Sequence, residues 1–214
     1  MNARTIAISA AASWLILSLP PLRLALEREM AVQMAVQMPL LIAVGVLLAG
    51  WVRRYEPHWL ADADWLGISG IVLVVFGTSF WMLPRALDEA VSEPLVDLAK
   101  FLSLPLLVGL PLGLSWHRMP PLGRAFIWAN FIPKLSAVGG LYLAAPTRLC
   151  AYYRLDQQNL AGWTLIAIAV ALGLTWFFAA FVGWTPSCGK HLPPVAATGA
   201  GSESALHGAP RILA

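Results

Sequence analysis

The sequence predicts an all-α protein, a polytopic bundle of about six transmembrane helices that is followed by a disordered C-terminal tail. Of the 214 residues, 59% are hydrophobic and only 12% are charged, whereas soluble domains carry about twice that share of charge. Apolar stretches of about 20 residues, the length needed to cross a bilayer, recur along the chain. Most of the ten Trp residues lie near the ends of these stretches, as expected for aromatic belts at the membrane surface.

Six stretches are expected to span the membrane, and each is bounded by polar residues or by proline. They are residues 5–19, 30–51, 65–83, 94–116, 125–145 and 160–184. The first has the length of a signal-peptide core, but no small-residue cleavage pattern follows it, which favours a short span. The fourth is interrupted by Pro105 and Pro111, which remove backbone donors inside a helix.

Polar connections separate these spans. Residues 21–29, 52–64, 117–124 and 146–159 are expected to be loops, and residues 84–93 a helical turn at the membrane surface. Residues 185–214 are rich in Gly, Pro, Ala and Ser, which predicts a disordered tail after a single transmembrane domain of residues 1–184. An even number of spans puts both termini on one side. We expect that side to be the cytoplasm, because Arg118 and Arg124 lie in a short loop without acids.

The second span begins with a repeated pattern of thioethers and amides. Met30, Met34 and Met38 recur every four residues, and Gln33 and Gln37 precede two of them. At about 100° per residue, these five side chains form one stripe on a helix. Thioether sulfur is a soft ligand that suits Cu(I). Alternatively, Met fills space in the core and Gln forms hydrogen bonds between helices.

Further soft ligands and acids are expected at the same membrane surface. With six spans, the segments after the first, third and fifth spans share one face. Met82 ends the third span there, and Cys150 lies in the loop after the fifth. The sixth span begins nearby with three polar side chains, Asp156, Gln157 and Gln158.

Four stretches of this sequence carry a family resemblance. They follow the patterned second span in this order: FWMLPRALDEA, a proline-rich fourth span ending in LSW, LYLAAPTRLCAYY and LDQQNLAGW. Over residues 30–184 the sequence resembles the CtaG-type family of bacterial membrane proteins. The resemblance implies a location in the bacterial inner membrane. It also implies a role in supplying copper to a haem-copper oxidase, with Cu(I) as cargo and an oxidase subunit as partner.

The sequence departs from the family at its usual histidines. The family typically carries His near Gln33 and Gln37, at Met82 and at Lys100, and a Met at Lys134. Two interpretations stay open. Either the site has become an all-thioether Cu(I) site, or the metal role has been lost and the scaffold remains as a structural subunit of a membrane oxidase. The first interpretation predicts a set of sulfur ligands: Met30, Met34, Met38, Met82 and Cys150.

Lys134 is expected near the middle of the fifth span. A charge at that depth costs about 2.5–3.5 kcal/mol on insertion scales, so its side chain should face the bundle interior. We expect it to pair with an acid or with carbonyls freed by Pro133. It would serve either as a proton or substrate relay or as a structural pair between helices.

Four acids lie near the start of the fourth span: Asp88, Glu89, Glu93 and Asp97. They would form either a solvated turn or a patch that attracts a cation or a basic partner.

Other classes of function find no support. The sequence has no Walker loop, GxGxxG or GxSxG motif in a suitable context. The four His residues fall in loops or in the tail, which argues against a bis-His haem in the bundle. The net charge of +3 is spread over many segments, which argues against a nucleic-acid partner. We therefore predict a non-enzymatic protein in contact with membrane lipid. The hypothesis of a small channel or transporter is supported only by Lys134 and by the proline-broken fourth span. The sequence has no internal repeat of the kind that many transporters contain.

Overall fold

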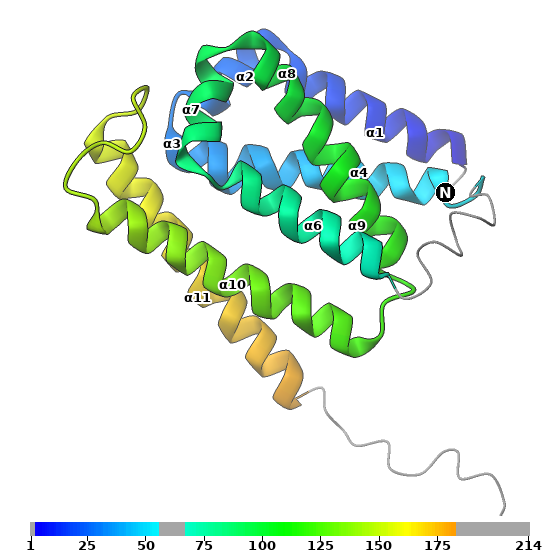
Figure 1. The fold of residues 1–214 in the computed structure, drawn as a ribbon. Helices are drawn as coiled ribbons and strands as arrows, with labels where there is room; N and C mark the ends of the chain where they lie inside the picture. The colour runs from blue at the N-terminus through cyan, green and yellow to red at the C-terminus, as the bar shows by residue number, and fades with distance from the viewer. Residues whose placement is uncertain (1–2, 56–66, 183–214) are drawn as a thin grey trace, which may run out of the picture.

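The computed structural model describes residues 3–55 and 67–182, and within these ranges the chain is helical and contains no strand. Figure 1 shows the longer helices running back and forth roughly along one direction, with the short α2 and α7 turned away from it. In chain order they are α1 (Ala3–Ser18), α2 (Pro20–Glu27), α3 (Met30–Val32), η1 (Gln33–Gln37), α4 (Met38–Val52), α6 (Ile68–Trp81), α7 (Pro84–Ser92), α8 (Pro94–Ser103), η2 (Leu104–Gly109), α9 (Leu110–Ser115), α10 (Pro121–Ala144) and α11 (Leu155–Val182).

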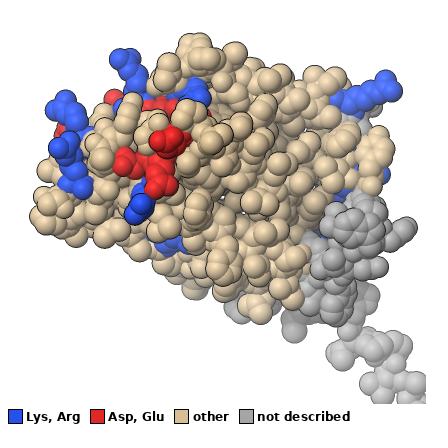
Figure 2. All heavy atoms as spheres, turned by 45° about the horizontal axis from the view of Figure 1, so that its top comes forward, with Lys and Arg blue, Asp and Glu red and all other residues tan. Residues whose placement is uncertain are grey.

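Two ends of the bundle are distinguished by what they contain. At the polar end lie α2, α7, the start of α8 and the segment between α10 and α11 (Figure 1). At the opposite end, here called the terminal end, α1 begins and α4 ends, and α9 leads to α10. Figure 2 shows acidic side chains gathered at the polar end with basic ones beside them, and a largely uncharged surface between the two ends. An uncharged surface between two charged ends is the pattern of a membrane protein.

The described residues contain three to five candidate membrane spans, fewer than the six predicted. Three helices are long and apolar enough to cross a membrane: Met30–Val52, Pro94–Ser115 and Leu155–Ala179. The count among the described residues rises to five if two bent pairs are each one span. Those pairs are Arg4–Ser18 with Pro20–Glu27, bent by 66°, and Ile68–Trp81 with Pro84–Ser92, bent by 69°. α10, predicted as the fifth span, is not among these candidates.

Several predicted boundaries are corrected. The expected loop at residues 21–29 is mostly the helix α2, because Pro20 and Pro21 occupy the first turn, where proline is tolerated. α10 begins four residues before the predicted span, again on a proline. α11 begins at Leu155, so the predicted loop at residues 146–159 is shorter than expected. The predicted tail, residues 185–214, and most of the loop at residues 52–64 lie outside the described residues.

The two wide turns η1 and η2 are π-helical, and each is followed closely by a proline. Met38 N donates to Gln33 O, five residues back, and Pro39 follows. Leu110 N donates to Pro105 O in the same way, and Pro111 follows. A proline ring inside a helix crowds the carbonyl four residues earlier. A widened turn just before the proline relieves that crowding, and such π segments often mark functional sites.

α4 and η2 cross with their backbones in contact. A Cβ atom added to Gly45 would overlap Pro105 O, and one added to Gly109 would overlap Ile42 O. α10 and α11 approach similarly, since a Cβ on Gly139 would lie 2.8 Å from Gly162 O. Glycine allows this close approach because it has no side chain, a common feature of packed transmembrane helices.

Candidate functional site

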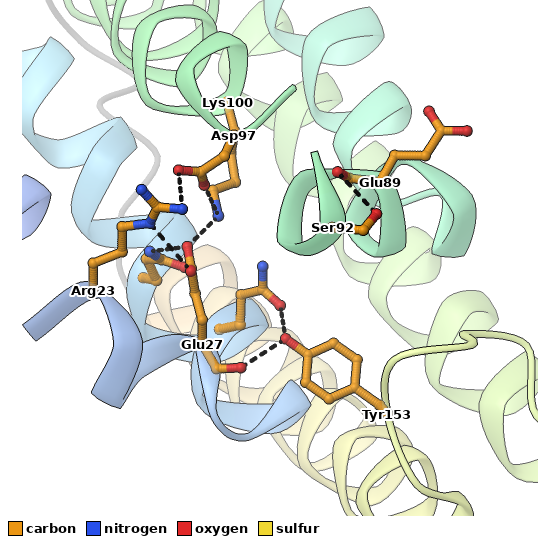
Figure 3. A network of polar contacts seen from close by, with 9 residues as sticks. Arg23, Glu27, Glu89, Ser92, Asp97, Lys100 and Tyr153 are labelled. Atoms are coloured by element: carbon orange, nitrogen blue, oxygen red, sulfur yellow. Dashed lines mark hydrogen bonds and ion pairs between the residues drawn. The ribbon is translucent and has the colours of Figure 1, made fainter. Parts of the chain in front are cut away.

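Four charged side chains form a cluster at the polar end, three of them buried and Arg23 partly exposed (Figure 3). Lys100 Nζ lies 2.7 Å from Glu27 Oε1 and 2.9 Å from Asp97 Oδ1. Arg23 closes the cluster, with Nη2 2.7 Å from Asp97 Oδ2 and Nε 3.3 Å from Glu27 Oε2. The Lys100 side chain is 0% exposed. Two cations and two anions balance, which is the condition under which buried charges are tolerated.

Amide and phenol groups connect this cluster to η1. Gln37 Nε2 donates to Glu27 Oε1 at 3.1 Å. The Tyr153 hydroxyl lies 2.5 Å from Gln33 Oε1 and 2.9 Å from the Glu27 carbonyl (Figure 3). Among the described residues, Gln33 Nε2 and Gln37 Oε1 find no hydrogen-bond partner. In η1, the Gln37 amide thus contacts the charge cluster directly, and the Gln33 amide contacts it through Tyr153.

Local sequence places each of these groups. Arg23 and Glu27 are one helical turn apart on α2, and Asp97 and Lys100 are three residues apart on α8. Residues at such spacings lie on the same helix face. The 66° bend between α1 and α2 turns the face of α2 toward α8.

A second, apolar site lies beside the first. A cavity of about 490 Å³ separates α4, α6 and the η2–α9 segment from the α10–α11 pair. Met34, Met38 and Met82 are among its lining residues, so thioethers from the continuous η1–α4 segment and from the end of α6 line one space. Neither Met34 nor Met38 faces the lipid, since each is only 7% exposed. The predicted stripe is buried. Its amides contact Glu27 and Tyr153, whereas Met34 and Met38 line the cavity.

Two predicted sulfur ligands lie elsewhere. Met30 is fully buried but does not line the cavity. Cys150 donates to Pro84 O at 3.5 Å. Burial, aided by the nearby Asp88 charge, raises the pKa of the Cys150 thiol to about 11. A protonated thiol is a poor metal ligand. Across the described residues there is also no group of three or more His, Cys, Asp or Glu side chains that could hold a metal ion.

The predicted polar residues near the sixth span hold the segment between α10 and α11. Gln158 Oε1 accepts from Leu149 N at 2.9 Å, and Gln158 Nε2 donates to Tyr142 O at 3.0 Å. Gln157 Nε2 donates to Arg28 O at 3.2 Å. Asp156 is exposed and pairs with Arg154. Gln157 and Gln158 therefore hold backbone groups in place, whereas Asp156 makes only an exposed ion pair.

The four acids near α8 do not form one patch. Asp88 accepts hydrogen bonds from the backbone of Ala151 and Tyr152, at 3.1 and 2.8 Å. Glu89 pairs with Arg85 on the surface, whereas Asp97 is buried in the charge cluster. Asp97 is therefore separate from the other three acids, and the alternatives of a solvated turn or a patch that attracts a cation stay open for Asp88, Glu89 and Glu93.

Lys134 contacts α6 in place of an acid or the carbonyls freed by Pro133. Its Nζ lies 3.1 Å from Thr78 Oγ1 and 3.3 Å from Val75 O. Thr78 Oγ1 in turn donates to Val74 O at 2.6 Å. The expectation of an interior-facing ammonium with polar partners agrees with this geometry, and the partners themselves differ.

Arg23, Glu27 and Tyr153 belong to the site but were not predicted from the sequence. Glu27 was included in an expected loop, and Asp97 in a surface patch. One signal was available: Asp97 and Lys100 are ionisable residues inside a predicted span, and such residues usually mark a site and require partners. The partner itself was not apparent, because Glu27 lies in a distant segment.

Comparisons of the chain with family models, with curated proteins and with solved structures found no match. One site is a neutral cluster of buried charges, and the other is an apolar cavity with three thioethers in its wall.

Proposed function

We propose that this protein is a non-enzymatic membrane protein that carries Cu(I) and transfers it to a subunit of a haem-copper oxidase. The observation that supports the proposal is the shared position of Met34, Met38 and Met82 in the wall of one cavity. Soft thioethers favour Cu(I) over the harder divalent ions. Met30 and Cys150 are left out of the ligand set because neither lines the cavity.

The chemistry of this ligand set suits transfer. Thioethers bind without losing a proton, so affinity for Cu(I) should change little with pH. The bound ion would keep its full positive charge in an apolar cavity, which lowers affinity because no anion compensates it. Ligand exchange to a partner site that contains anionic or imidazole ligands would then be favourable.

The number of spans and the side on which the termini lie are part of the same proposal. We infer six spans, with α10 added to the five candidates, and Lys134 made tolerable by its contacts with α6. The basic loop at residues 117–124 supports cytoplasmic termini. The bacterial inner membrane is what the family resemblance implies. Membership of the CtaG-type family, and with it the oxidase partner, is supported by the sequence motifs described above.

The test is metal analysis of the protein purified from copper-replete cells. We expect copper to co-purify, and to be lost when Met34, Met38 and Met82 are all changed to Leu. Met119→Leu is the matched control, since Met119 is 3% exposed and lies outside the cavity. Met30→Leu should also retain copper. The proposal fails if the wild-type protein carries no copper, or if the triple variant retains it.

A specific observation favours a second candidate, a structural subunit of a membrane oxidase. Gln33, Gln37 and Lys100, three positions where the resemblance implies His, belong to the charge cluster around Glu27. The positive charge that faces Glu27 and Asp97 there is the Lys100 ammonium, so the cluster needs no metal ion to balance its acids. A stoichiometric complex that survives detergent and contains no copper in this protein would favour this candidate.

A further inference from the structure

The apolar cavity is elongated along the helices. Its lining extends from Leu104 in η2 to Trp116 just after α9, a distance of about 18 Å at 1.5 Å per residue. The lining of α10 runs over a similar length, from Ile127 to Val138. A volume of about 490 Å³ along such a length suits an extended ligand better than a compact one.

The cavity is more enclosed toward the polar end, where Met82 and Val138 are nevertheless half-buried, than toward the other end. Trp81 and Leu104, toward the polar end, are 4% and 1% exposed. Trp116, Trp128 and Leu172, toward the terminal end, are half-buried. A ligand would therefore enter from the half of the membrane nearer the terminal end.

The lining is apolar over nearly its whole length. Thr78 carries its one hydroxyl group, and that hydroxyl already contacts Val74 O and Lys134 Nζ. A polar ligand group inside the cavity would lose its hydrogen bonds to water without replacement, at a cost of several kcal/mol. An organic ligand that fits this wall must therefore be apolar along the inserted part.

A cation lies beside the more open end. Arg124, in the first turn of α10, donates from Nε to Trp116 O at 3.2 Å, and its guanidinium lies 5.6 Å from the centre of the Trp116 ring. This bond uses one of the five donors of arginine. Residues 117–124 contain no acid. Basic groups between transmembrane helices at the membrane surface are typical binding places for anionic headgroups.

We propose that the cavity binds one acyl chain of an anionic phospholipid, with the lipid phosphate at Arg124. The more open end, the apolar wall and the cation at the surface match the tail and the headgroup of such a lipid in one orientation. This proposal does not depend on copper. The sulfurs of Met34 and Met82 lie toward the more enclosed end, so an inserted acyl chain would shield them from water.

The test compares lipid retention by the full-length protein in bilayer discs of equal phosphatidylglycerol and phosphatidylcholine, followed by transfer to mild detergent and native mass spectrometry. We expect one retained phospholipid per protein, enriched at least threefold in phosphatidylglycerol. Leu172→Trp fills the cavity and should lower occupancy at least fivefold. Leu174→Trp is the control, because Leu174 is on the same helix and 54% exposed. Arg124→Gln should retain a lipid and lose the enrichment.

Three results would overturn the proposal. They are equal retention in Leu172→Trp and Leu174→Trp, unchanged enrichment in Arg124→Gln, and a retained mass that belongs to an isoprenoid lipid or a free fatty acid. Leu112→Trp provides a second variant that fills the cavity if Leu172→Trp does not fold, as judged by thermal unfolding. Copper content, measured on the same samples, separates failure of this proposal from failure of the copper proposal.

Discussion

Lys100 and Glu27 are 73 residues apart in the sequence, and Lys100 Nζ lies 2.7 Å from Glu27 Oε1 inside the protein. This pair joins α8 to α2, and it also fixes Gln37 through the shared Oε1 atom. Because water does not reach Lys100, each partner depends on the others for compensation of its charge.

Removing the Lys100 charge should destabilise the protein strongly. Lys100→Met leaves Glu27 and Asp97 with only Arg23 as counter-ion, and breaking a buried pair in this way typically costs about 3–5 kcal/mol. Thermal unfolding in detergent measures the loss. Arg85→Met is the control, since the Arg85–Glu89 pair is exposed and should contribute less than about 1 kcal/mol.

The double variant Lys100→Met with Glu27→Gln tests the cause of that loss. It restores neutrality to the cluster, so it should be more stable than Lys100→Met alone. A double variant that is less stable than the single one would show that packing, and not charge balance, determines the effect.

Gly45→Ala should destabilise the crossing of α4 and η2. The added Cβ would overlap Pro105 O, a backbone atom that cannot move aside by itself. Overpacking of this kind costs about 1–3 kcal/mol. In Gly50→Ala, on the same helix, the new Cβ would lie 3.7 Å from Ile6, an ordinary contact. Equal melting temperatures for the two variants would contradict this account of the crossing.

Asp88→Ala should expose Cys150 to alkylating reagents. Asp88 holds the backbone of Ala151 and Tyr152, directly after Cys150, which is 1% exposed. In a Cys188→Ser background we expect alkylation at least tenfold faster than with intact Asp88. Glu89→Ala, which changes a neighbouring surface acid paired with Arg85, should leave the rate unchanged.

The pH dependence of the same reaction checks the state of the thiol. Burial, with the Asp88 charge, raises the pKa of Cys150 to about 11. Since the thiolate is the reactive form, the alkylation rate with intact Asp88 should rise about tenfold per pH unit up to that pKa. A rate that levels off near pH 8.5 would indicate an ordinary, solvated thiol.

Lys134→Met should insert and fold but weaken association with a partner. An ammonium has three donors, and two of them meet Thr78 and Val75 on α6. We expect the third to serve a neighbouring subunit, so the amount of co-purified partner should fall severalfold. Ser136→Ala, two residues away and exposed, is the control. An unchanged amount of co-purified partner with Lys134→Met would exclude this role.

Local patterns allowed part of the site to be predicted. The repeat of Met and Gln in residues 30–38 indicated a buried face, and Met34, Met38, Gln33 and Gln37 are indeed buried. The order of the segments indicated that Met82, Cys150 and Gln158 lie toward one end, where Cys150 contacts Pro84. The division of the stripe was not predictable at 100° per residue, because η1 is a π-helix with a wider turn.

The sequence by itself determined that this is an all-helical protein with apolar helices suited to a membrane, because composition and segment length decide which residues tolerate lipid. Only the tertiary structure decided which buried polar groups meet. Glu27 reaches Lys100 because α2 bends back by 66° from α1, and the π turn directs Gln37 to Glu27 while Met34 and Met38 line the cavity. Such pairings depend on bend angles and helix rotation, and neither is encoded in the spacing of residues along one helix.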